Sequence, residues 1–576
     1  MATRQSAVRA TDLLAGISEL WKSGLQKEAS AGPARIGVCV SGGPDSMALA
    51  YLLNQIPQIE PDLRIKPVAL IVNHNARPGS ALEAESVARR LEKHNIESHV
   101  LDMRWATELE PLKSTRFEMV ARSNRYQLIA QAALQGHIRH LFLGHHLDDQ
   151  VETVMMRLIR NTNTSFLGFR GMAERSNIPC CENIRGAHES VEFRTAEQYV
   201  SHNLQSRLAK WSKGVNNGRP VGVSDAQGLQ LHRPLLQFSK SQLIKTCLEH
   251  EIEYVTDKTN FDPTLTMRNA VRHMRATHKL PRALQPASVL HLMTTAQQSS
   301  QSLKNRGEAL LSHVQVVEFD LRMGSMKIKL SQDFGSRCKT DTEAAAYALS
   351  RLMSVISPQD GEARVTLAPE ARVEEFIKSL LSNNKTATHQ IDQTSMQRMM
   401  DKPYLQPGES LWKLYRPPMR PSERMAATMM FELSSKEPAD AKAGVWSEWK
   451  LWDHRYWIRV KAQSAEQISS ITIRDLCLDE DRGKLRDGLP ENNKFWQEYK
   501  ELALGKMKWP IPVLTWKENI AVFPTLNVRV PERKPAVYKP QQPENSYPIL
   551  EWEICYRSLD QSFIQDQKDN IVWKNV

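Results

Sequence analysis

Residues 38–46 read Val38-Cys39-Val40-Ser41-Gly42-Gly43-Pro44-Asp45-Ser46. Before them an apolar run starts at Ile36, and after them a helix-like run extends from Met47 to Leu53. The first pattern predicts a buried strand and the second a helix. Glycines let successive N–H groups converge on an anion, and a helix N-terminus adds a positive dipole end. The stretch therefore predicts a phosphate-binding loop formed by Ser41, Gly42, Gly43, Pro44, Asp45 and Ser46.

The loop is not a Walker loop, because that motif requires a lysine directly after its last glycine and none is present. Ser-Gly-Gly-x-Asp-Ser instead resembles the pyrophosphate loop (PP-loop) of the N-type ATP pyrophosphatases. The resemblance implies an enzyme that splits ATP between its α and β phosphates and adenylates an oxygen of the substrate. The alternative is a strand-to-helix turn of a different nucleotide or sugar enzyme.

Length and composition indicate a multidomain globular protein. The 576 residues favour roughly two to four domains. Hydrophobic residues make up 41% and charged residues 24%, and no apolar run approaches the ~20 residues of a membrane helix, so we expect no membrane partner. The net charge of +11 fits a polyanionic partner such as nucleic acid, although many basic proteins bind none.

The cysteines and the N-terminus bear on the compartment. Seven scattered cysteines without a Cys-x-x-Cys pair indicate neither a zinc ribbon nor a redox dithiol, and they favour a reducing compartment. The first ten residues carry Arg4 and Arg9, and no acid precedes Asp12. This composition is compatible with a mitochondrial segment, and equally with an exposed tail or the start of a helix. We expect a mitochondrial location, with a cytoplasmic one as the alternative.

Strands and helices alternate along the first part of the chain. Further strands are predicted at 67–72, 98–101 and 139–144, and helices at 81–93, 117–134 and 151–159. This alternation predicts a doubly wound parallel α/β sheet, in which ligands bind at the carboxyl ends of the strands. Polar residues 41–46, 73–77 and 145–150 all follow strands, so we expect them to line one crevice.

The later organisation is less regular. Residues 180–230 are interpreted as a partly disordered insertion, followed by helices at 239–250, with Ser239 as N-cap, and 265–277. Helices are expected at 285–312 and 341–382, and strands at 446–460 and 511–530. The predicted domains are a tail or targeting segment (1–33), the loop-bearing domain (34–280), a helical linker domain (281–410) and a β-rich module (411–576), with a boundary at the Pro-rich residues 413–421.

Tryptophan is concentrated in the last part of the chain. Ten of the thirteen tryptophans lie from Trp412 onward, so the C-terminal module is predicted to be Trp-rich. Such residues can stack nucleobases, but more often they form the core of a small β domain, which is the interpretation we favour.

Several acids and histidines are candidates for a site. Magnesium prefers a few carboxylates together with phosphate and water oxygens, which makes Asp45, Asp148 and Asp149 candidate ligands. Alternatively, the acid pair stabilises a helix N-terminus. The adjacent His145 and His146 are interpreted as a polar wall near the nucleotide rather than as zinc ligands.

Two groups of arginines are candidates for binding anions. Glu118, Arg122 and Arg125 share a helix face, either as a surface ion pair or to hold a phosphate or carboxylate. Arg233 precedes a second set, Arg268, Arg272 and Arg275. That set is either a solvated basic face or a contact with nucleic-acid phosphates.

Over residues 34–280 the motifs match one family in order. The sequence resembles the tRNA(Ile)-lysidine synthases. After the loop, the matching pieces are His74-Asn75-Ala76-Arg77-Pro78-Gly79-Ser80, Glu83-Ala84, Arg122-x-x-Arg125-Tyr126, Gly144-His145-His146-x-Asp148-Asp149-Gln150-x-Glu152-Thr153, Leu167-Gly168-Phe169-Arg170-Gly171-Met172, Arg233-Pro234-Leu235-Leu236, Asp257-x-Thr259-Asn260 and Arg268-Asn269-x-x-Arg272.

The resemblance implies a fold like that of the adenine nucleotide α hydrolases and a ligase reaction. ATP adenylates O2 of the wobble cytidine of a CAU-anticodon isoleucine tRNA, and the amine of free lysine then displaces AMP. ATP would lie on Ser41–Ser46 with His74 and His145. Asp45, Asp148, Asp149, Arg122 and Arg233 would serve catalysis. Mg²⁺ would be held by Asp45 and Asp149, with Asp148 as the alternative to Asp149. Arg268, Arg272 and Arg275 would contact tRNA. Asp148, Asp149 and Glu152 remain alternative bases for the amine.

Some features depart from the family pattern. The insertion is longer than expected of bacterial members, and the chain after 281 does not match their C-terminal domains. Both departures suggest a eukaryotic, fungal-like relative acting on a mitochondrial tRNA. The alternatives are a tRNA thiolation enzyme, for which only Cys180 and Cys181 lie together, and an inactive RNA-binding relative, against which the intact loop argues. A homodimer is left open.

Overall fold

The fold is taken from a computed structural model of the 576-residue chain. The structure describes residues 6–29, 32–76, 78–105, 117–160, 166–188, 190–194, 223–226, 228–256, 262–277, 280–357, 367–382, 384, 386–391, 393–400, 405–433, 446–462, 470–477, 481, 485, 496, 510–516, 519–526, 528–530, 550–558, 563, 567 and 571–574.

The chain divides into two compact units. The first comprises residues 1–189 and 227–302, and the second comprises residues 190–226 and 303–576. Helix α10 (Pro286–Leu311) contains the residues at which the first unit ends and the second begins. The predicted insertion is divided as well, because its described strands β6 (Ser190–Arg194) and β7 (Val223–Ala226) belong to the second unit.

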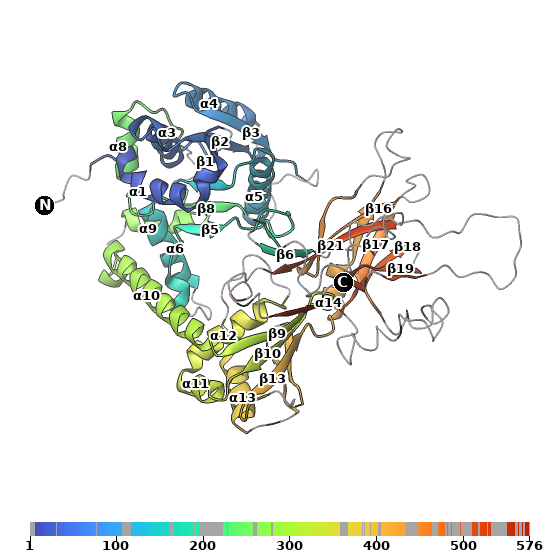
Figure 1. Ribbon diagram of the computed structural model, residues 1–576. Coiled ribbons are helices and arrows are strands. Elements are labelled where there is room, and N and C mark those ends of the chain that lie inside the picture. Colours follow the sequence, from blue (N-terminus) through green and yellow to red (C-terminus); the bar gives the residue numbers. More distant parts are fainter. Residues whose placement is uncertain are drawn as a thin grey trace, which may run out of the picture. The chain divides into compact units, whose positions relative to one another are not determined.

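The first unit alternates strands and helices as predicted (Figure 1). Its strands are β1 (Ala34–Val40), β2 (Ile65–Asn73), β3 (Glu97–Asp102), β4 (His140–Leu143), β5 (Arg175–Asn177) and β8 (Gln230–His232). Its helices are α1 (Ala10–Leu20), η1 (Trp21–Leu25), α2 (Gln26–Glu28), α3 (Pro44–Ile59), α4 (Ser80–Glu92), α5 (Phe117–Gln135), α6 (Leu147–Arg160), η3 (Phe166–Phe169), α8 (Lys240–Glu249), α9 (Met267–Thr277) and η7 (Arg282–Leu284), followed by the start of α10.

The sheet of the first unit has the order β3-β2-β1-β4-β8-β5. The first five strands are parallel, and β5 pairs antiparallel with β8 at the edge. The chain moves outward from β1 to β2 and β3 and then returns to β4 on the other side of β1. Such a reversal leaves a crevice at the carboxyl ends of the two central strands, which is where doubly wound folds bind ligands. The predicted fold class of this part is confirmed.

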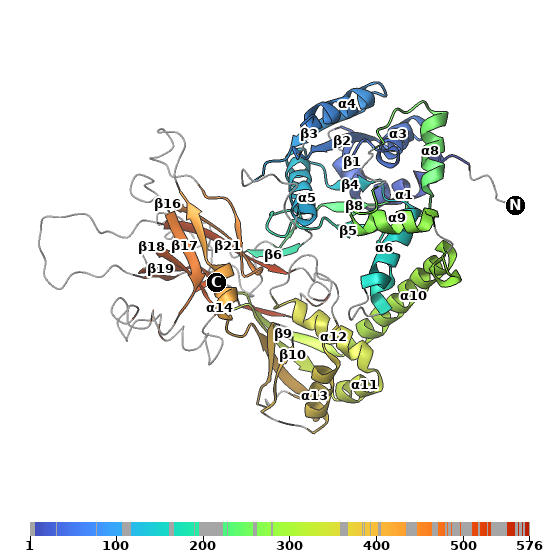
Figure 2. The same cartoon turned by 180° about the vertical axis from the view of Figure 1, so that it is seen from behind.

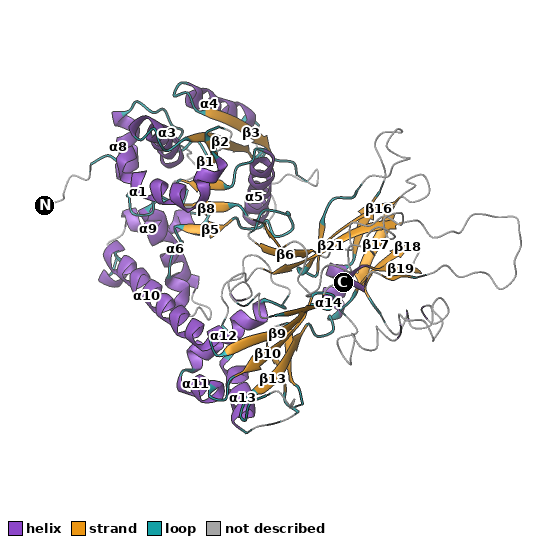
Figure 3. Ribbon diagram, in the orientation of Figure 1, coloured by secondary structure: helices purple, strands orange, loops and turns teal. Residues whose placement is uncertain are grey.

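Helices cover both faces of this sheet, as Figure 3 shows. On one face, buried residues of α1, α3, α4 and α8 pack against Ile36, Val38 and Val40 of β1. On the other, Tyr126, Ile129 and Ala133 of α5 pack against β2, β4 and β8. Figure 2 shows α3 and α8 again opposite α5 when seen from behind. Because both faces are buried, the central strands are apolar throughout, as expected for a parallel sheet.

The N-terminal residues differ from the predicted tail at 1–33. Leu13, Ile17 and Leu20 of α1 are each only 3% exposed and belong to the same core as β1 and α3. Ahead of the helix, the Val8 N–H donates to Thr246 Oγ1 of α8 at 2.9 Å. The apolar spacing in α1 explains the packing, since these three residues share one helix face. Residues 7–29 are therefore part of the domain.

The second unit contains three sheets and several short helices. Its strands besides β6 and β7 are β9 (Val314–Asp320), β10 (Ser325–Leu330), β11 (Thr388–Ile391), β12 (Thr394–Arg398), β13 (Ser410–Tyr415), β14 (Met429–Glu432), β15 (Lys450–Trp452), β16 (Tyr456–Ala462), β17 (Ser470–Asp475), β18 (Pro512–Trp516), β19 (Asn519–Phe523), β20 (Val528–Arg529), β21 (Leu550–Ser558) and β22 (Val572–Lys574). Its helices are α11 (Phe334–Thr340), α12 (Thr342–Ser354), α13 (Glu370–Leu381), α14 (Pro421–Ala427) and η10 (Pro524–Leu526).

Strand pairing in this unit crosses the predicted boundary near residue 410. The sheets have the orders β11-β12-β13-β10-β9-β22, β14-β17-β18-β19-β20 and β15-β16-β21-β6-β7. Because β13 pairs with β10 from Ser325↔Tyr415 to Leu330↔Ser410, Lys413 lies in a strand rather than in a linker. Residues 281–410 contain the predicted helices but also strands, so they are not a purely helical linker domain.

Several tryptophans of this unit lie in its core. Trp412 and Trp452 are 0% exposed and Trp457 is 2% exposed. At such burial these three are core residues and cannot stack on a nucleobase. Among the described residues of the whole chain, no helix combines the length and the apolar character needed to span a membrane.

Candidate active site

The loop after β1 is held by its own hydroxyl groups. The Ser41 N–H donates to Ser46 Oγ at 3.1 Å, and the two hydroxyls lie 3.2 Å apart. Gly42 has φ +84°, a left-handed conformation that favours glycine, and a Cβ there would lie 2.6 Å from Val87 Cγ2. Helix α3 starts directly afterwards with Pro44 at its first position. The strand, loop and helix predicted from residues 38–46 are confirmed.

The end of β4 touches the loop from the neighbouring strand. A Cβ on Gly144 would lie 3.0 Å from the backbone of Asp45 and Ser46, so only glycine permits this approach. Because β1 and β4 are adjacent and parallel, His145 and His146 follow at the same edge of the sheet. The predicted convergence of residues 41–46 with 145–150 is therefore present.

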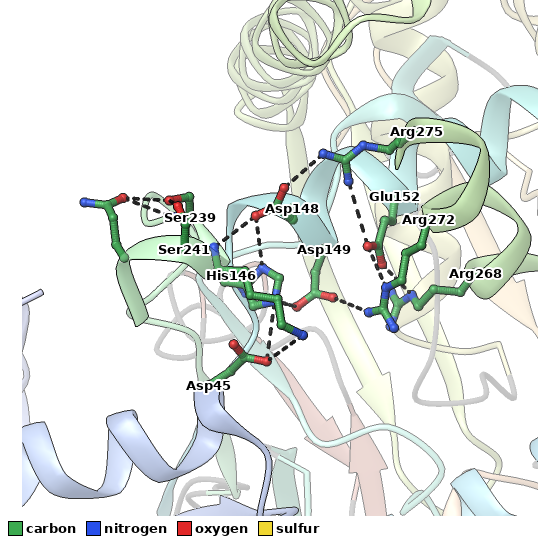
Figure 4. A network of polar contacts seen from close by, with 12 residues as sticks. Asp45, His146, Asp148, Asp149, Glu152, Ser239, Ser241, Arg268, Arg272 and Arg275 are labelled. Atoms are coloured by element: carbon green, nitrogen blue, oxygen red, sulfur yellow. Dashed lines mark hydrogen bonds and ion pairs between the residues drawn. The ribbon is translucent and has the colours of Figure 1, made fainter. Parts of the chain in front are cut away.

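His146 lies at the centre of three carboxylates (Figure 4). Its Nε2 is 3.5 Å from Asp45 Oδ2 and 3.5 Å from Asp149 Oδ2, and its Nδ1 is 3.8 Å from Asp148 Oδ2. Burial by itself would lower the pKa of His146, but the three acids raise the pKa above its usual value. The three acids therefore favour the protonated imidazole.

The two aspartates of α6 have separate partners. Asp149 Oδ2 accepts the backbone N–H of His146 at 3.1 Å, so Asp149 caps the N-terminus of α6. Asp148 accepts the backbone N–H of Lys240 at 3.0 Å and Arg275 Nη2 at 2.9 Å. Burial opposes ionisation of both acids, but these donors and charges hold the pKa of each carboxyl below its usual value. Of the two aspartates, Asp149 is therefore the one that stabilises the helix N-terminus, which was the alternative interpretation of this acid pair.

Glu152, one turn further along α6, is enclosed by the arginines of α9. Its side chain is only 3% exposed, and Arg272 Nε donates to Oε1 at 2.7 Å. Arg268 Nε lies 3.3 Å from Oε2, and Arg275 Nη1 lies 3.8 Å from Oε1. The three arginines share one helix face as predicted, but that face meets α6 rather than solvent. Their predicted contact with tRNA stays a prediction.

His145 lies near the guanidiniums of Arg233, Arg268 and Arg122. Burial, together with these positive charges, lowers its pKa to about 4, while Asp149 opposes the shift. The imidazole is therefore neutral at physiological pH. Arg233 Nη1 donates to Ala173 O and Ser176 Oγ, which fixes the guanidinium, while burial lowers the pKa of Arg233.

The remaining predicted positions lie on adjoining elements. The Arg122 and Arg125 guanidiniums lie 5.0 Å and 5.4 Å from the ring of Tyr126 on α5. His74 follows β2, and burial lowers its pKa, with Arg125 nearby adding to the shift. Arg77, residues 257–261 and the side chain of Glu118 lie outside the described residues.

A comparison with known protein families matches the part of the chain that contains these site residues. A family model described as a PP-loop domain matches residues 17–203 and 213–278. The part of the chain that carries the site is therefore similar to PP-loop domains. The match includes the Ser41–Ser46 loop and every residue that meets it in the crevice.

Curated relatives narrow the resemblance. The chain is 24% identical over 519 residues to the probable tRNA(Ile)-lysidine synthase of Schizosaccharomyces pombe, covering 87% of this chain and 93% of that protein. The tRNA(Ile)-lysidine synthase of Lactobacillus johnsonii is 26% identical over 49% of this chain, and that of Enterococcus faecalis 37% identical over 26%. The chain spans 50% and 30% of these two bacterial relatives. The resemblance inferred from the motifs, including the fungal-like character, is confirmed.

Several buried polar atoms without a hydrogen-bond partner lie in the PP-loop crevice. Within the described residues they include Asp45 Oδ1, His145 Nδ1, His146 Nδ1 and Arg233 Nε. Buried polar atoms in native proteins normally have partners, so unsatisfied atoms of both signs at one place indicate a ligand with both anionic and cationic groups.

The acids fit a magnesium ion that is shared with phosphates. The described residues contain no group of three His, Cys, Asp or Glu side chains arranged around a metal ion. Mg²⁺ in nucleotide sites needs only one or two carboxylates besides phosphate and water oxygens. Asp45, with its unpartnered Oδ1, and Asp149 can supply those, and their role as a metal-binding pair stays a prediction.

Sequence reasoning missed two features of the PP-loop site. Lys240, the first residue of α8, has its Nζ 3.7 Å from Asp45 Oδ2. Gln150 binds both the N–H and the C=O of Met172, at 2.6 Å and 2.9 Å, and so ties the Leu167–Met172 motif to α6. The N-cap at Ser239 marks where α8 begins, but no local pattern shows that this helix points at the loop.

Proposed function

We propose that the protein is an ATP-dependent ligase that joins lysine to C2 of the wobble cytidine of an isoleucine tRNA with a CAU anticodon. The reaction proceeds through an adenylated tRNA and releases AMP and pyrophosphate. Support comes from the ordered motifs, the PP-loop domain, and relatives named tRNA(Ile)-lysidine synthase, one of them matched over 87% of this chain.

One observation carries the proposal: a phosphate-type loop, three carboxylates and a set of arginines share a single crevice. The loop and the arginines suit the phosphates of ATP and tRNA, whereas the acids suit the ammonium and amine of lysine. Unpartnered buried atoms of both signs occur among these groups, at Asp45 and Arg233. A site for ATP alone would not require the acidic side.

The chemistry assigns roles to these groups. The cytidine O2 attacks the α phosphorus, and the bond to the bridging oxygen of pyrophosphate breaks, while Ser41–Ser46 hold the departing phosphates. Mg²⁺ held by Asp45 and Asp149 would neutralise phosphate charge when bound. Lysine then attacks C2 and AMP leaves with the former O2. The proton of the amine goes to Asp148, Asp149 or Glu152, between which the structure leaves the choice open.

The test incubates the protein with ATP, labelled lysine and the CAU-anticodon tRNA. We expect label in the tRNA, and its loss in Asp45→Ala. Absence of label while ATP still binds would contradict lysine transfer and point to a different amine or a thiol donor. A tRNA with a GAU anticodon is the substrate control.

Thiolation is the alternative within the same fold. It would need a reactive thiol, but Cys181 is 1% exposed and burial raises the pKa of its thiol, as it does for Cys39 and Cys247. Lysine transfer that survives replacement of Cys180 and Cys181 by serine excludes a thiol role. An inactive RNA-binding relative is excluded by any tRNA-dependent ATP–pyrophosphate exchange.

We further propose a mitochondrial location, which rests only on Arg4, Arg9 and the absence of acids before Asp12. Microscopy of the chain fused at its C-terminus to a fluorescent protein tests it, and a diffuse cytoplasmic signal would contradict it. Sedimentation of the purified protein decides between a monomer and a homodimer.

A further inference from the structure

Helix α8 presents a lysine to a loop that has none of its own. In a Walker loop the lysine that contacts the phosphates follows the glycines directly, whereas here Pro44 follows Gly43. Lys240 lies far along the chain, yet its Nζ is 3.7 Å from Asp45 Oδ2. An ammonium group therefore stands beside the loop from outside it.

The position of Lys240 is fixed from several sides. Its backbone N–H donates to Asp148 Oδ2 at 3.0 Å, and Leu147 N–H donates to Phe238 O at 2.8 Å, which joins the start of α8 to the start of α6. Val255 N–H donates to Gly42 O at 2.8 Å, which joins the segment after α8 to the loop itself. Ser239 and Gln242 complete a capping box at the N-terminus of α8. Figure 4 shows this helix end facing Asp45 and Asp148.

The side chain, in contrast to the backbone, is free to be redirected. The side chain of Lys240 is 44% exposed, and its pairing with Asp45 is a long ion pair without a hydrogen bond between the two groups. Ion pairs of this kind are weak, because water screens them and the lysine stem is flexible. An incoming polyphosphate offers the ammonium several oxygens of higher charge than the single carboxylate does.

The charges around Lys240 favour an anionic ligand group beside its ammonium. The N-termini of α3 and α8 add positive dipole ends beside its ammonium. A second ammonium, that of a lysine substrate, is disfavoured next to it, so the amine substrate is directed to the acids of α6. The departing pyrophosphate, which gains negative charge as its bond to the α phosphate breaks, is the matching group.

We propose that Lys240 is a phosphate-binding residue of the PP-loop site, which transfers from Asp45 to the β and γ phosphates of ATP and to the pyrophosphate product. This inference rests on the ATP-dependent part of the proposed function and does not depend on which acceptor is adenylated. It supplies from α8 the positive group that the loop lacks.

The experiment measures binding of inorganic pyrophosphate and of AMP to the full-length protein by calorimetry, for the wild type, Lys240→Met and Lys240→Arg. The matched control is Lys245→Met, an exposed lysine five residues further along the same helix. We expect Lys240→Met to weaken pyrophosphate binding about 10- to 100-fold, as for loss of a charged hydrogen bond, and to leave AMP binding unchanged. Lys240→Arg should restore part of the affinity, and Lys245→Met should resemble the wild type.

Unchanged pyrophosphate affinity in Lys240→Met would overturn the inference and leave Lys240 as a structural partner of Asp45. Equal losses for AMP and pyrophosphate would overturn it too, since they indicate a general disturbance of the site. If Lys240→Met does not fold, Lys240→Gln is measured against the same two ligands. Failure of the proposed ligase function would appear separately, as wild-type protein that binds pyrophosphate but transfers no lysine.

Discussion

The Ser41–Ser46 loop and the acids and arginines of α6 and α9 meet in one crevice, but different kinds of chemical group form them. The second set, called the α6–α9 network below, consists of Asp148, Asp149, Glu152, Arg268, Arg272 and Arg275. The loop uses backbone N–H groups and two hydroxyls, and the hydrogen bonds within it join residues at most five positions apart. The network uses full charges from two helices, with Glu152 and Arg272 as its centre. The loop is thus formed in advance for an anion. In the network every charge already has a protein partner, so a charged substrate must exchange with that partner.

Loss of the Asp45 carboxylate should have the largest effect on activity. Asp45 belongs to the loop, and its carboxylate also contacts His146 beside the α6–α9 network. We expect Asp45→Ala to lower ATP–pyrophosphate exchange by about 100-fold or more, since a metal-binding carboxylate stabilises charge that develops on phosphate. Stability should change little, because the side chain is partly exposed. The matched control is Asp62→Ala in an exposed turn. Exchange within tenfold of the wild type would show that the loop functions without this carboxylate.

Loss of Glu152 should affect stability more than any loop residue does. Removing one partner of a buried ion pair costs about 3–5 kcal/mol, but Arg268 and Arg272 are about one-third exposed, so we expect about 2–3 kcal/mol for Glu152→Gln. Urea unfolding followed by circular dichroism measures it. Glu85→Gln, an exposed acid paired with Arg89, is the control and should cost under about 0.5 kcal/mol. Equal midpoints for both variants would mean that the network does not hold α9.

Replacement of the α9 arginines distinguishes contact with tRNA from contact with α6. We expect Arg268→Ala and Arg272→Ala each to weaken tRNA binding several-fold, and to reduce the slope of log K against log salt by about 0.9 for each lost phosphate contact. Filter binding at four salt concentrations gives both values. Arg89→Ala, on α4, serves as the control arginine. Weaker binding with an unchanged slope would mean that these arginines act through Glu152 and never touch phosphate.

The last prediction concerns how folding stability depends on pH. It separates the contribution of two buried histidines from that of the crevice residues. At the opposite end of β4, His140 Nδ1 and His232 Nε2 lie 3.0 Å apart, and burial lowers their pKa values to about 4 and about 3. The folded protein keeps both neutral, whereas the unfolded chain binds protons below about pH 6.5. Stability is therefore lost as pH falls from about 6.5 toward 4.

His232→Gln should reduce the stability difference between pH 7 and pH 5 by about 1–2 kcal/mol. Urea midpoints at the two pH values measure it, with His250→Gln, an exposed histidine at the end of α8, as the control. An unchanged difference would assign the acid sensitivity to other groups, including those of the crevice.

The loop is formed by local interactions and the α6–α9 network by long-range ones. This difference explains how much of the structure could be predicted from the sequence. The loop, the strands β1 to β4 and the helices α3 to α9 follow from local patterns, because glycines, apolar runs and caps are read within a few residues, whereas the short strands β5 and β8 were not predicted. The partners of Arg268, Arg272 and Arg275 do not follow, since spacing shows that the three share a face but not what that face meets. Lys240 was missed for the same reason.

In the second unit, too, local sequence patterns do not predict long-range contacts, here the pairing of strands. Val314–Asp320 and Ser325–Leu330 were placed in a helical domain because the longer helices around them dominate the pattern. Their pairing with residues 410–415 joins segments that are far apart in sequence, and no local signal records it. The buried Trp412 was, however, correctly interpreted as a core residue.

The packing of residues 7–29 constrains how this chain can be matured. A cut just after Val8 would remove the hydrogen bond between the Val8 N–H and Thr246 Oγ1, and a cut beyond Leu20 would also remove Leu13, Ile17 and Leu20 from the core. Proteolytic processing therefore leaves this packing intact only if the cut lies before Ala7. Mass spectrometry of the N-terminus of the purified protein would show whether residues 7–29 are retained.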